Sequence, residues 1–453
     1  MAPQTAKSLM KEFRASFRRK KVTDSTTKIE KAKALEEEEL AKLVELKENL
    51  GENLPPQYTD AHLLGFLRAR SLNVKEAQKL MKIDANMCQF LRADAILDEY
   101  EPSEANMQCS ISGMIGFDKE GSLIRVMNVG YGDYKGFIHS ISTIEEFKIF
   151  IWSIQKDSIL QAEECKKKGY KCNQIVYILN LENISMSQVM YKPALDTGLL
   201  ALKLLQDHYH DVAKAIYIVN APIFFSSIFK LFKPVIGDSL EKRLKIFDGD
   251  DWREQLLKHI DADILPAYLG GNRVDSNNDP LCREFIGFGG IIPESSYAAD
   301  FLDLEDPDVV IATVPAGATL NFRFSTPIVG TVIQWHIQAK DNDIGIGVFY
   351  EPLDADSNSS KNSQKKAKEI DVSELEPLTP IIRSQCHICP EIGSTVTWLS
   401  GTTILHFDNT YSWMNSKEVQ FKIIIEPPVV KDNNILNSVN NAANAVRKMT
   451  VKQ

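Results

Sequence analysis

A short, strongly apolar segment that directly follows a predicted strand constrains the fold of this chain more than any other feature. The strand covers 216–219 and leads through Asn220-Ala221-Pro222 into 223–232, a segment that contains four Phe, two Ile and one Leu before Lys233-Pro234 ends it. A helix that is apolar on all sides must be buried, inserted in a membrane, or able to move between the two. The segment has about ten residues and includes Lys230, whereas a bilayer crossing needs roughly 20 apolar residues. We therefore interpret it as a mobile lid over an apolar cavity, with a plain buried core helix as the alternative.

The composition indicates a cytoplasmic globular protein of two or three domains. The chain has 453 residues, of which 44% are apolar, and it contains no run of 18 apolar residues. Its net charge of −9 argues against nucleic acid as a partner. Seven scattered cysteines favour a reducing compartment, and the start of the chain lacks the apolar stretch of a secretory signal.

The first residues differ in charge from the rest of the chain. Residues 1–21 contain seven Lys or Arg against one acid, Glu12, and Leu9, Met10, Phe13 and Phe17 recur among them at helical spacing. This pattern predicts a basic amphipathic helix that lies transiently on a membrane surface, where each cation contributes about 1 kcal/mol near anionic lipid. A disordered basic arm is the alternative.

Hydrophobic periodicity changes twice along the chain. Helical patterns at 27–50, 60–70 and 73–91 are followed by strands alternating with helices up to about 260, which indicates a sheet with parallel pairs and helical cover. Short β-rich runs separated by turn residues then indicate an antiparallel sandwich. We therefore expect five parts: a basic amphipathic arm at 1–26, a helical unit at 27–105, an α/β domain at 106–273, a β-sandwich at 274–428, and a tail at 429–453.

Several sequence stretches resemble known families. DAHLLGFLRARSLNVKEA at 60–77, YIVNAP at 217–222, Lys233-Pro234 and ILPAYLGGN at 264–272 resemble the CRAL-TRIO lipid-transfer family. GATLNFRFSTPIVGTVIQW at 317–335 and FDNTYSWMNSKEVQFKI at 407–423 resemble a GOLD domain. Their order is similar to that of the tocopherol-associated, supernatant-protein-factor-like branch.

The resemblance implies both a fold and a function. The fold class is an α/β CRAL-TRIO lipid-binding domain preceded by a small all-helical unit and followed by an antiparallel β-sandwich (GOLD). The implied function is non-catalytic: a cytosolic protein that takes one lipid from a bilayer, encloses it and exchanges it at membranes, with peripheral membrane association. A lipid-gated adaptor whose GOLD domain binds a protein partner is the alternative.

Candidate cavity residues follow from strand alternation and from the resemblance. Alternation places Ile175, Tyr177 and Leu179 on one face of the central strand. The family's cavity strands and the lid spacing add the other members. The candidate cavity residues are Met127, Val129, Ile151, Ile175, Tyr177, Leu179, Ile218, Phe225, Ile228 and Phe232. For each of them an ordinary core position is the alternative.

The resemblance also implies a head-group site. Its positions fall at Arg70, Asp211, Lys242 and Arg243, and two arginines could clamp a phosphate. Ser71 and Leu240, however, stand where phosphatidylinositol-handling members have a cation and a hydroxyl. The expected ligand is therefore a phosphoinositide, a tocopherol-like molecule, or an isoprenoid or sterol precursor, the last two being favoured by these two departures.

Signals for catalysis or a cofactor are weak. Cys386-His387-Ile388-Cys389 has no second pair of ligands at metal-binding spacing, and 207–211 (DHYHD) is better explained as a polar connection. The chain contains no nucleophile elbow, P-loop or HExxH motif. We expect no catalytic residue, metal or cofactor, and a lipid-modifying hydrolase is the least favoured alternative.

Overall fold

A computed structural model describes residues 25–51, 58–169, 174–210, 212–247, 249–298, 302–352, 372, 375–397 and 400–428. The chain forms two compact units: the first combines 1–81, 103–134 and 154–291, and the second combines 82–102, 135–153 and 292–453. The predicted tail at 429–453, and all but the last two residues of the predicted arm at 1–26, lie outside the described residues.

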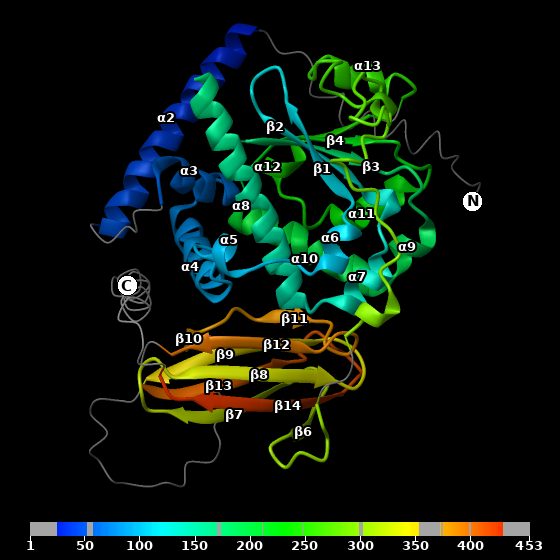
Figure 1. The fold of residues 1–453 in the computed structure, drawn as a ribbon. Coiled ribbons are helices and arrows are strands. Elements are labelled where there is room, and N and C mark those ends of the chain that lie inside the picture. Colours follow the sequence, from blue (N-terminus) through cyan, green and yellow to red (C-terminus); the bar gives the residue numbers. More distant parts are fainter. Residues whose placement is uncertain are drawn as a thin grey trace, which may run out of the picture. The chain divides into compact units, whose positions relative to one another are not determined.

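Helices open the first unit, as the periodicity predicts (Figure 1). The helices are α2 (Ser25–Leu50), α3 (Asp60–Ala69) and α4 (Val74–Phe90), the last of which is divided between the units. Thr59 caps α3 by accepting a hydrogen bond from the His62 N–H. Arg68 of α3 forms a two-pronged ion pair with Glu39 of α2, at 2.8 and 2.7 Å. Leucines on the inner faces of α2 and α3 are fully buried, so the two helices pack through one apolar seam.

A five-stranded sheet follows in the order β1-β2-β3-β4-β5, with β1 antiparallel to β2 and the other pairs parallel. The strands are β1 (Ser112–Phe117), β2 (Leu123–Asn128), β3 (Ile175–Asn180), β4 (Ala213–Val219) and β5 (Leu244–Ile246). Met127 pairs with Leu179, and Leu179 pairs with Ile218. These three side chains therefore share one face of the sheet.

Further helices precede, connect and follow these strands. They are α5 (Ile96–Glu99), α6 (Glu104–Gln108), η2 (Val129–Tyr131), α7 (Tyr134–Ser140), α8 (Thr143–Lys168), α9 (Met186–Met190), α10 (Lys192–His208), α11 (Phe225–Phe232), α12 (Asp238–Glu241), α13 (Trp252–Leu257), η3 (Ala267–Leu269) and η4 (Glu294–Ser296). Helices α9 and α10 are separate because Tyr191 between them is extended, and Pro193 lies in the first turn of α10.

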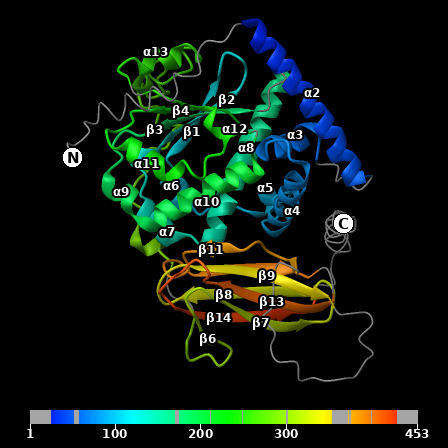
Figure 2. The same ribbon diagram turned by 180° about the vertical axis from the view of Figure 1, so that it is seen from behind.

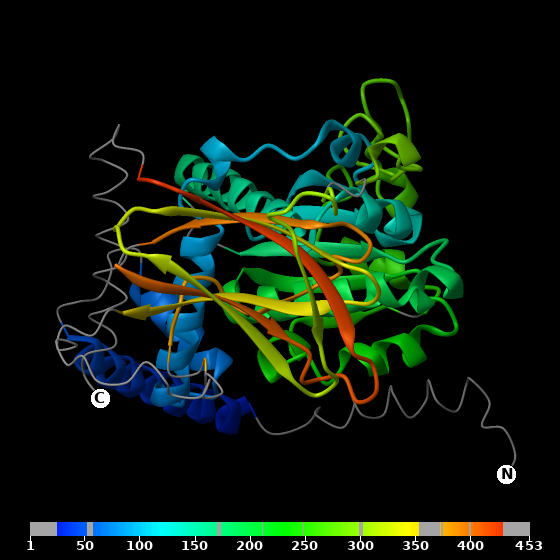
Figure 3. The same ribbon diagram turned by 90° about the horizontal axis from the view of Figure 1, so that it is seen from below.

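The second unit contains two antiparallel sheets, as the β-rich runs predict (Figure 3). One has the order β10-β9-β13-β7, with β11 also paired to β9, and the other has the order β12-β8-β14-β6. The strands are β6 (Val310–Val314), β7 (Thr319–Thr326), β8 (Val332–Ala339), β9 (Ile344–Pro352), β10 (Glu376–Pro377), β11 (Ile382–Ser384), β12 (Glu391–Val396), β13 (Gly401–Asp408) and β14 (Lys417–Glu426).

Aromatic rings join the two sheets of the second unit. The Phe421 ring of β14 lies 4.6 Å from Phe322 of β7 and 5.3 Å from Phe407 of β13, measured between ring centroids. Phe90, from the earlier segment of the same unit, stacks on Trp335 of β8 at 6.1 Å. The sandwich therefore has its own apolar core.

Candidate functional site

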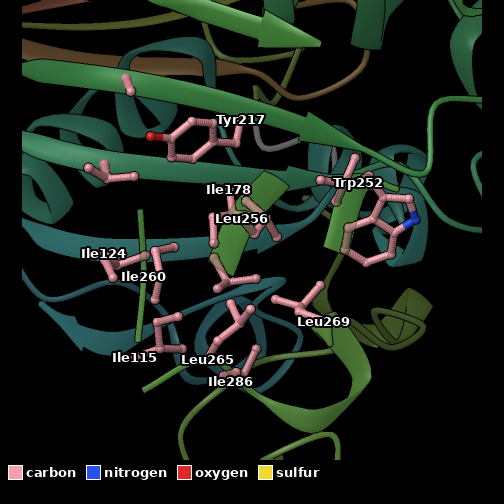
Figure 4. Close-up of a cluster of buried hydrophobic side chains, with 14 of the residues drawn as sticks. Ile115, Ile124, Ile178, Tyr217, Trp252, Leu256, Ile260, Leu265, Leu269 and Ile286 are labelled. Carbon is pink, nitrogen blue, oxygen red and sulfur yellow. The ribbon is translucent and has the colours of Figure 1, made fainter. Parts of the chain in front are cut away.

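One face of the first unit's sheet is fully packed. Ile124 and Val126 of β2, Val176 and Ile178 of β3, and Val219 of β4 have at most 1% of their surface exposed. They pack against Trp252 and Leu256 of α13 and against residues from 260 to 286, as the labelled side chains in Figure 4 show. This face is an ordinary close-packed core.

The opposite face of the same strands is packed less completely. Tyr177 and Leu179 of β3 and Met127 of β2 are only half-buried, although their sequence neighbours are closed off from solvent. Tyr177 and Leu179 lie against an apolar cluster to which α11 and α12 contribute Phe225, Phe229 and Leu240. We call this surface of the sheet, with α11 over it, the lid face. Met127, Tyr177 and Leu179 on this face retain accessible surface, whereas Ile175 and Ile218 on it are buried.

The structure places most candidate cavity residues on the lid face. Val129, Tyr177, Leu179, Ile218 and Phe225 belong to its apolar cluster, and Met127 shares the face through its pairing with Leu179. Ile175 lies on the same side of β3 and is fully buried. Ile151 is buried in the part of α8 that belongs to the second unit, so it is not one of the lid-face residues described for the first.

The lid helix α11 is amphipathic rather than apolar on all sides. Phe225 and Phe229, one turn apart, are its buried residues, and their rings lie 5.8 Å from each other. The expected inward set of Phe225, Ile228 and Phe232 is therefore displaced: Ile228 is half-buried and Phe229 takes the buried position, because i, i+4 residues share a helix face. Phe232 is half-buried and its ring faces Gly198 of α10, where an added Cβ would lie 3.8 Å away.

Large apolar side chains remain exposed around the lid. Ile223, just before α11, is 81% exposed, and Leu231 of α11 is 45% exposed. Met186 and Met190 of α9 are 44% and 65% exposed. Helices α9 and α11 lie at the same end of the first unit (Figures 1 and 2). The lid segment thus presents aromatic residues to the sheet and aliphatic residues to solvent.

The predicted head-group arginines lie around the end of α10. Arg70 donates a hydrogen bond to Asp207 at 2.9 Å and another to the carbonyl oxygen of Ala69 at 3.1 Å. Asp207 also pairs with Lys203. Burial would raise the pKa of Asp207, but the two cations outweigh it, and the net shift is downward. Arg70 is therefore held in an internal ion pair.

Arg243 is engaged by backbone in the same region. It donates to the carbonyl oxygens of His210 and Ala213, at 2.9 and 2.7 Å. Lys242 is exposed, and Asp211 lies outside the described residues. Leu240, the predicted departure from a hydroxyl, is 7% exposed within the apolar cluster of the lid face. The sequence analysis did not predict that Asp207 pairs with Arg70 and Lys203, although it noted the dense polar cluster at 207–211.

The family model for "CRAL/TRIO domain" matches residues 107–271, which include the whole sheet and the lid helix. Residues 107–271 are therefore similar to the CRAL/TRIO domain family. This similarity implies lipid binding or transfer.

Curated relatives share more of the chain than this domain. "Protein ctg-1" of Caenorhabditis elegans is 26% identical over 369 residues, which cover 81% of this chain and 91% of that protein. "CRAL-TRIO domain-containing protein T23G5.2" of Caenorhabditis elegans is 23% identical over 360 residues, or 77% of this chain and 48% of that protein. The crystal structure of Sfh5 matches with 12% identity and a TM-score of 0.38, and it covers 48% of this chain and 83% of that chain.

Buried amides tie together three strands of the first unit's sheet. Asn180 of β3 donates to Asn128 of β2 at 3.1 Å, and Asn220, just after β4, donates to Asn180 at 2.8 Å. Tyr268 donates its hydroxyl hydrogen to Asn128 at 3.2 Å. Since Asn128 and Asn180 are fully buried, this ladder satisfies polar groups that water cannot reach. Its sequence signal is an asparagine at or just after the end of each strand.

Metal sites and membrane-spanning helices are absent from the part of the chain that the structure describes. There, no cluster of three or more His, Cys, Asp or Glu side chains is placed to hold a metal ion. Within the same residues, no helix is both long enough and apolar enough to span a bilayer. Cys386 and Cys389 are buried, and burial raises the pKa of both thiols, that of Cys389 to about 12.

Proposed function

We propose that this protein is a non-catalytic carrier that encloses one hydrophobic lipid on the lid face of its CRAL/TRIO domain and exchanges it at membranes. One observation carries the proposal: the two faces of the same strands are packed unequally. Val176 and Ile178 have no more than 1% of their surface exposed. Tyr177 and Leu179, their neighbours in the same strand, keep accessible surface although they pack against the apolar cluster of the lid face. An apolar ligand would complete the packing of that face.

The energetic need for such a site is large. A phospholipid exposes about 30 acyl methylenes to water, and each costs about 0.8 kcal/mol, so unassisted transit costs on the order of 25 kcal/mol. A carrier must offset most of this cost. Its lid must also open only at a membrane, where lipid can replace the contacts that the lid loses. The lid segment meets both requirements. Phe225 and Phe229 are buried when it is closed, and Ile223 and Leu231 are exposed and can contact a membrane.

The lid face favours a neutral lipid over a phosphoinositide. Arg70 is paired with Asp207, and Arg243 is bonded to two backbone carbonyl groups. Leu240 adds an apolar surface where a phosphate would need a donor. We therefore propose a tocopherol-like molecule or an isoprenoid or sterol precursor as the ligand.

The sandwich of the second unit extends the proposal. We assign it to the GOLD class, on the sequence resemblance and its two antiparallel sheets. The carrier works at the cytoplasmic surface of membranes as a peripheral protein. A lipid-gated adaptor, in which the sandwich binds a protein partner, is the competing function. Lipid that is bound by the protein but never exchanged between vesicles would favour the adaptor.

Transfer of a fluorescent lipid between donor and acceptor vesicles tests the lid. Phe229→Ala removes a buried contact of the closed lid, so lipid should leave the purified protein about tenfold faster. Ile223→Ser changes an exposed residue, so retention should be unchanged while vesicle-to-vesicle transfer slows. If both variants retain and transfer lipid as the unmodified chain does, α11 is not the gate.

A further inference from the structure

The second unit carries two large apolar side chains that are almost completely exposed. Trp413 is 95% exposed and Met414 is 88% exposed, in the loop that joins β13 to β14. We call residues 409–416 the tryptophan loop. Single exposed apolar residues are common on protein surfaces, but two adjacent ones of this size, one of them a tryptophan, are typical of interaction sites.

The backbone of the tryptophan loop is held firmly from below. Asn409 is fully buried, and its side-chain amide donates to the carbonyl oxygens of Val314, Pro315 and Asn415, at 3.2, 3.0 and 2.9 Å. These bonds close the base of the loop onto the end of β6. The two ends of the loop, 409 and 415, are therefore fixed by one side chain.

A second set of contacts anchors the middle of the loop. The Tyr411 hydroxyl donates to the carbonyl oxygen of Asp343 at 3.2 Å. Lys417, only 2% exposed, donates to the Tyr411 hydroxyl at 3.0 Å and pairs with the Asp343 carboxylate at 3.1 Å. The fold thus fixes the residues on either side of Trp413 and Met414, and the exposure of these two side chains is built into the loop.

The tryptophan loop and the turn beside it contain no charged residue. Residues 409–416 read NTYSWMNS, and the adjoining turn at 315–318 reads PAGA. The two segments touch, because the Gly317 N–H donates to the carbonyl oxygen of Asn409 at 3.1 Å. The residues of these segments add no desolvation cost of a charge of their own when they approach an apolar phase. The exposed guanidinium of Arg383, 4.1 Å from the centre of the Tyr411 ring, can stay with the lipid head groups.

We propose that the tryptophan loop is a second membrane-docking element, which inserts Trp413 and Met414 into the interfacial layer of a bilayer. A tryptophan suits that layer because its ring is apolar while its indole N–H can meet the head groups. The absence of charge in both segments favours a lipid surface over an electrostatically matched protein. This inference adds a second contact to the proposed carrier function and does not depend on which lipid is carried.

Vesicle binding by the full chain tests the proposal. Trp413→Ser and Met414→Ser should each weaken binding to phosphatidylcholine vesicles, the tryptophan change by about tenfold. The loss should be the same at low and high salt, because the side chains that these substitutions remove are uncharged. The matched control is Ile392→Ser, which removes a half-exposed apolar side chain from β12 of the same unit and should leave binding unchanged. Thermal unfolding of all three variants should match that of the unmodified chain.

A local readout separates insertion from indirect effects. Vesicles that contain brominated phosphatidylcholine should quench part of the tryptophan emission of the unmodified chain, and Trp413→Phe should abolish that quenching. Vesicle binding that Trp413→Ser does not change, or quenching that persists in Trp413→Phe, would overturn the proposal. The proposal would also be overturned if Trp413→Ser left vesicle binding unchanged but abolished binding of a protein partner or self-association.

The lipid content of the same protein preparations tests the carrier function separately from vesicle binding. The lipid extracted from purified Trp413→Ser should equal that from the unmodified chain, because Trp413 belongs to the second unit and is not one of the lid-face residues of the first. A chain that carries no lipid but still loses vesicle binding on substitution of Trp413 would contradict the carrier and leave the docking loop standing.

Discussion

Adjacent residues of β3 have opposite environments, and this contrast underlies the functional proposal. Ile178 is fully buried against the α13 side, whereas Leu179 is half-buried on the lid face. The two have nearly equal volume and the same strand context. A larger side chain at each position therefore probes the space on each side of the sheet.

Substitution with tryptophan should separate the two faces. Ile178→Trp overpacks a closed core and should destabilise the fold by about 3 kcal/mol or more. Leu179→Trp should cost about 1 kcal/mol or less, and it should reduce the lipid that co-purifies, because the ring occupies ligand space. Chemical denaturation and lipid extraction measure both effects. Equal destabilisation by the two changes would mean that the lid face is an ordinary core.

Residue-level prediction from the sequence succeeded where only local geometry was needed. Strand alternation placed Tyr177 and Leu179 together because a period of two follows from the backbone alone. The ion pair of Arg70 with Asp207 was not predictable in this way, because the two residues lie 137 positions apart in the chain. The lid spacing placed Ile228 inward where the structure buries Phe229, since both lie within the apolar arc of a short helix and packing decides which one is buried.

At the scale of elements, the start of α8 depends on a buried acid from the sandwich. The Ile144 N–H donates to Glu391 of β12 at 3.2 Å, and the Ser384 hydroxyl donates to the same carboxylate at 2.7 Å. Burial raises the pKa of Glu391 to about 7 despite these bonds. Burial and the charge of Glu391 raise the pKa of Glu146, one turn into α8, to about 8.

These shifts predict that stability falls as pH rises. Both acids have pKa values above the 4.5 of an ordinary glutamate, so the folded chain holds protons that the unfolded chain has already released. The free energy of unfolding should therefore decrease between about pH 5 and pH 8. Glu391→Gln should flatten this dependence and add about 1–3 kcal/mol at pH 8 relative to its effect at pH 5.

Urea unfolding at several pH values measures this slope. Glu305→Gln, which changes an exposed acid of the same unit, is the matched control and should leave the slope unchanged. A Glu391→Gln variant with the same pH dependence as the unmodified chain would show that the carboxylate does not titrate in this range.

At the scale of the whole molecule, the order of helical, α/β and β-rich regions was predictable because each has its own hydrophobic period. The grouping of the segments was not. Residues 82–102 and 135–153 belong to the same compact unit as the sandwich, through contacts such as the Phe90–Trp335 stack and the Ile144–Glu391 hydrogen bond. Such long-range pairings leave no periodic signal in the sequence.

The most direct test of the central claim is to identify what the purified full chain carries. After incubation with vesicles that contain tocopherol, squalene-like isoprenoids, phosphatidylcholine and phosphatidylinositol, the re-isolated protein is weighed by native mass spectrometry and its lipid is extracted. The account predicts one neutral lipid per chain, and less of it in Leu179→Trp. Protein that emerges at the mass of the bare chain from every mixture would contradict the account, and phosphatidylinositol as the bound species would refute its choice of ligand.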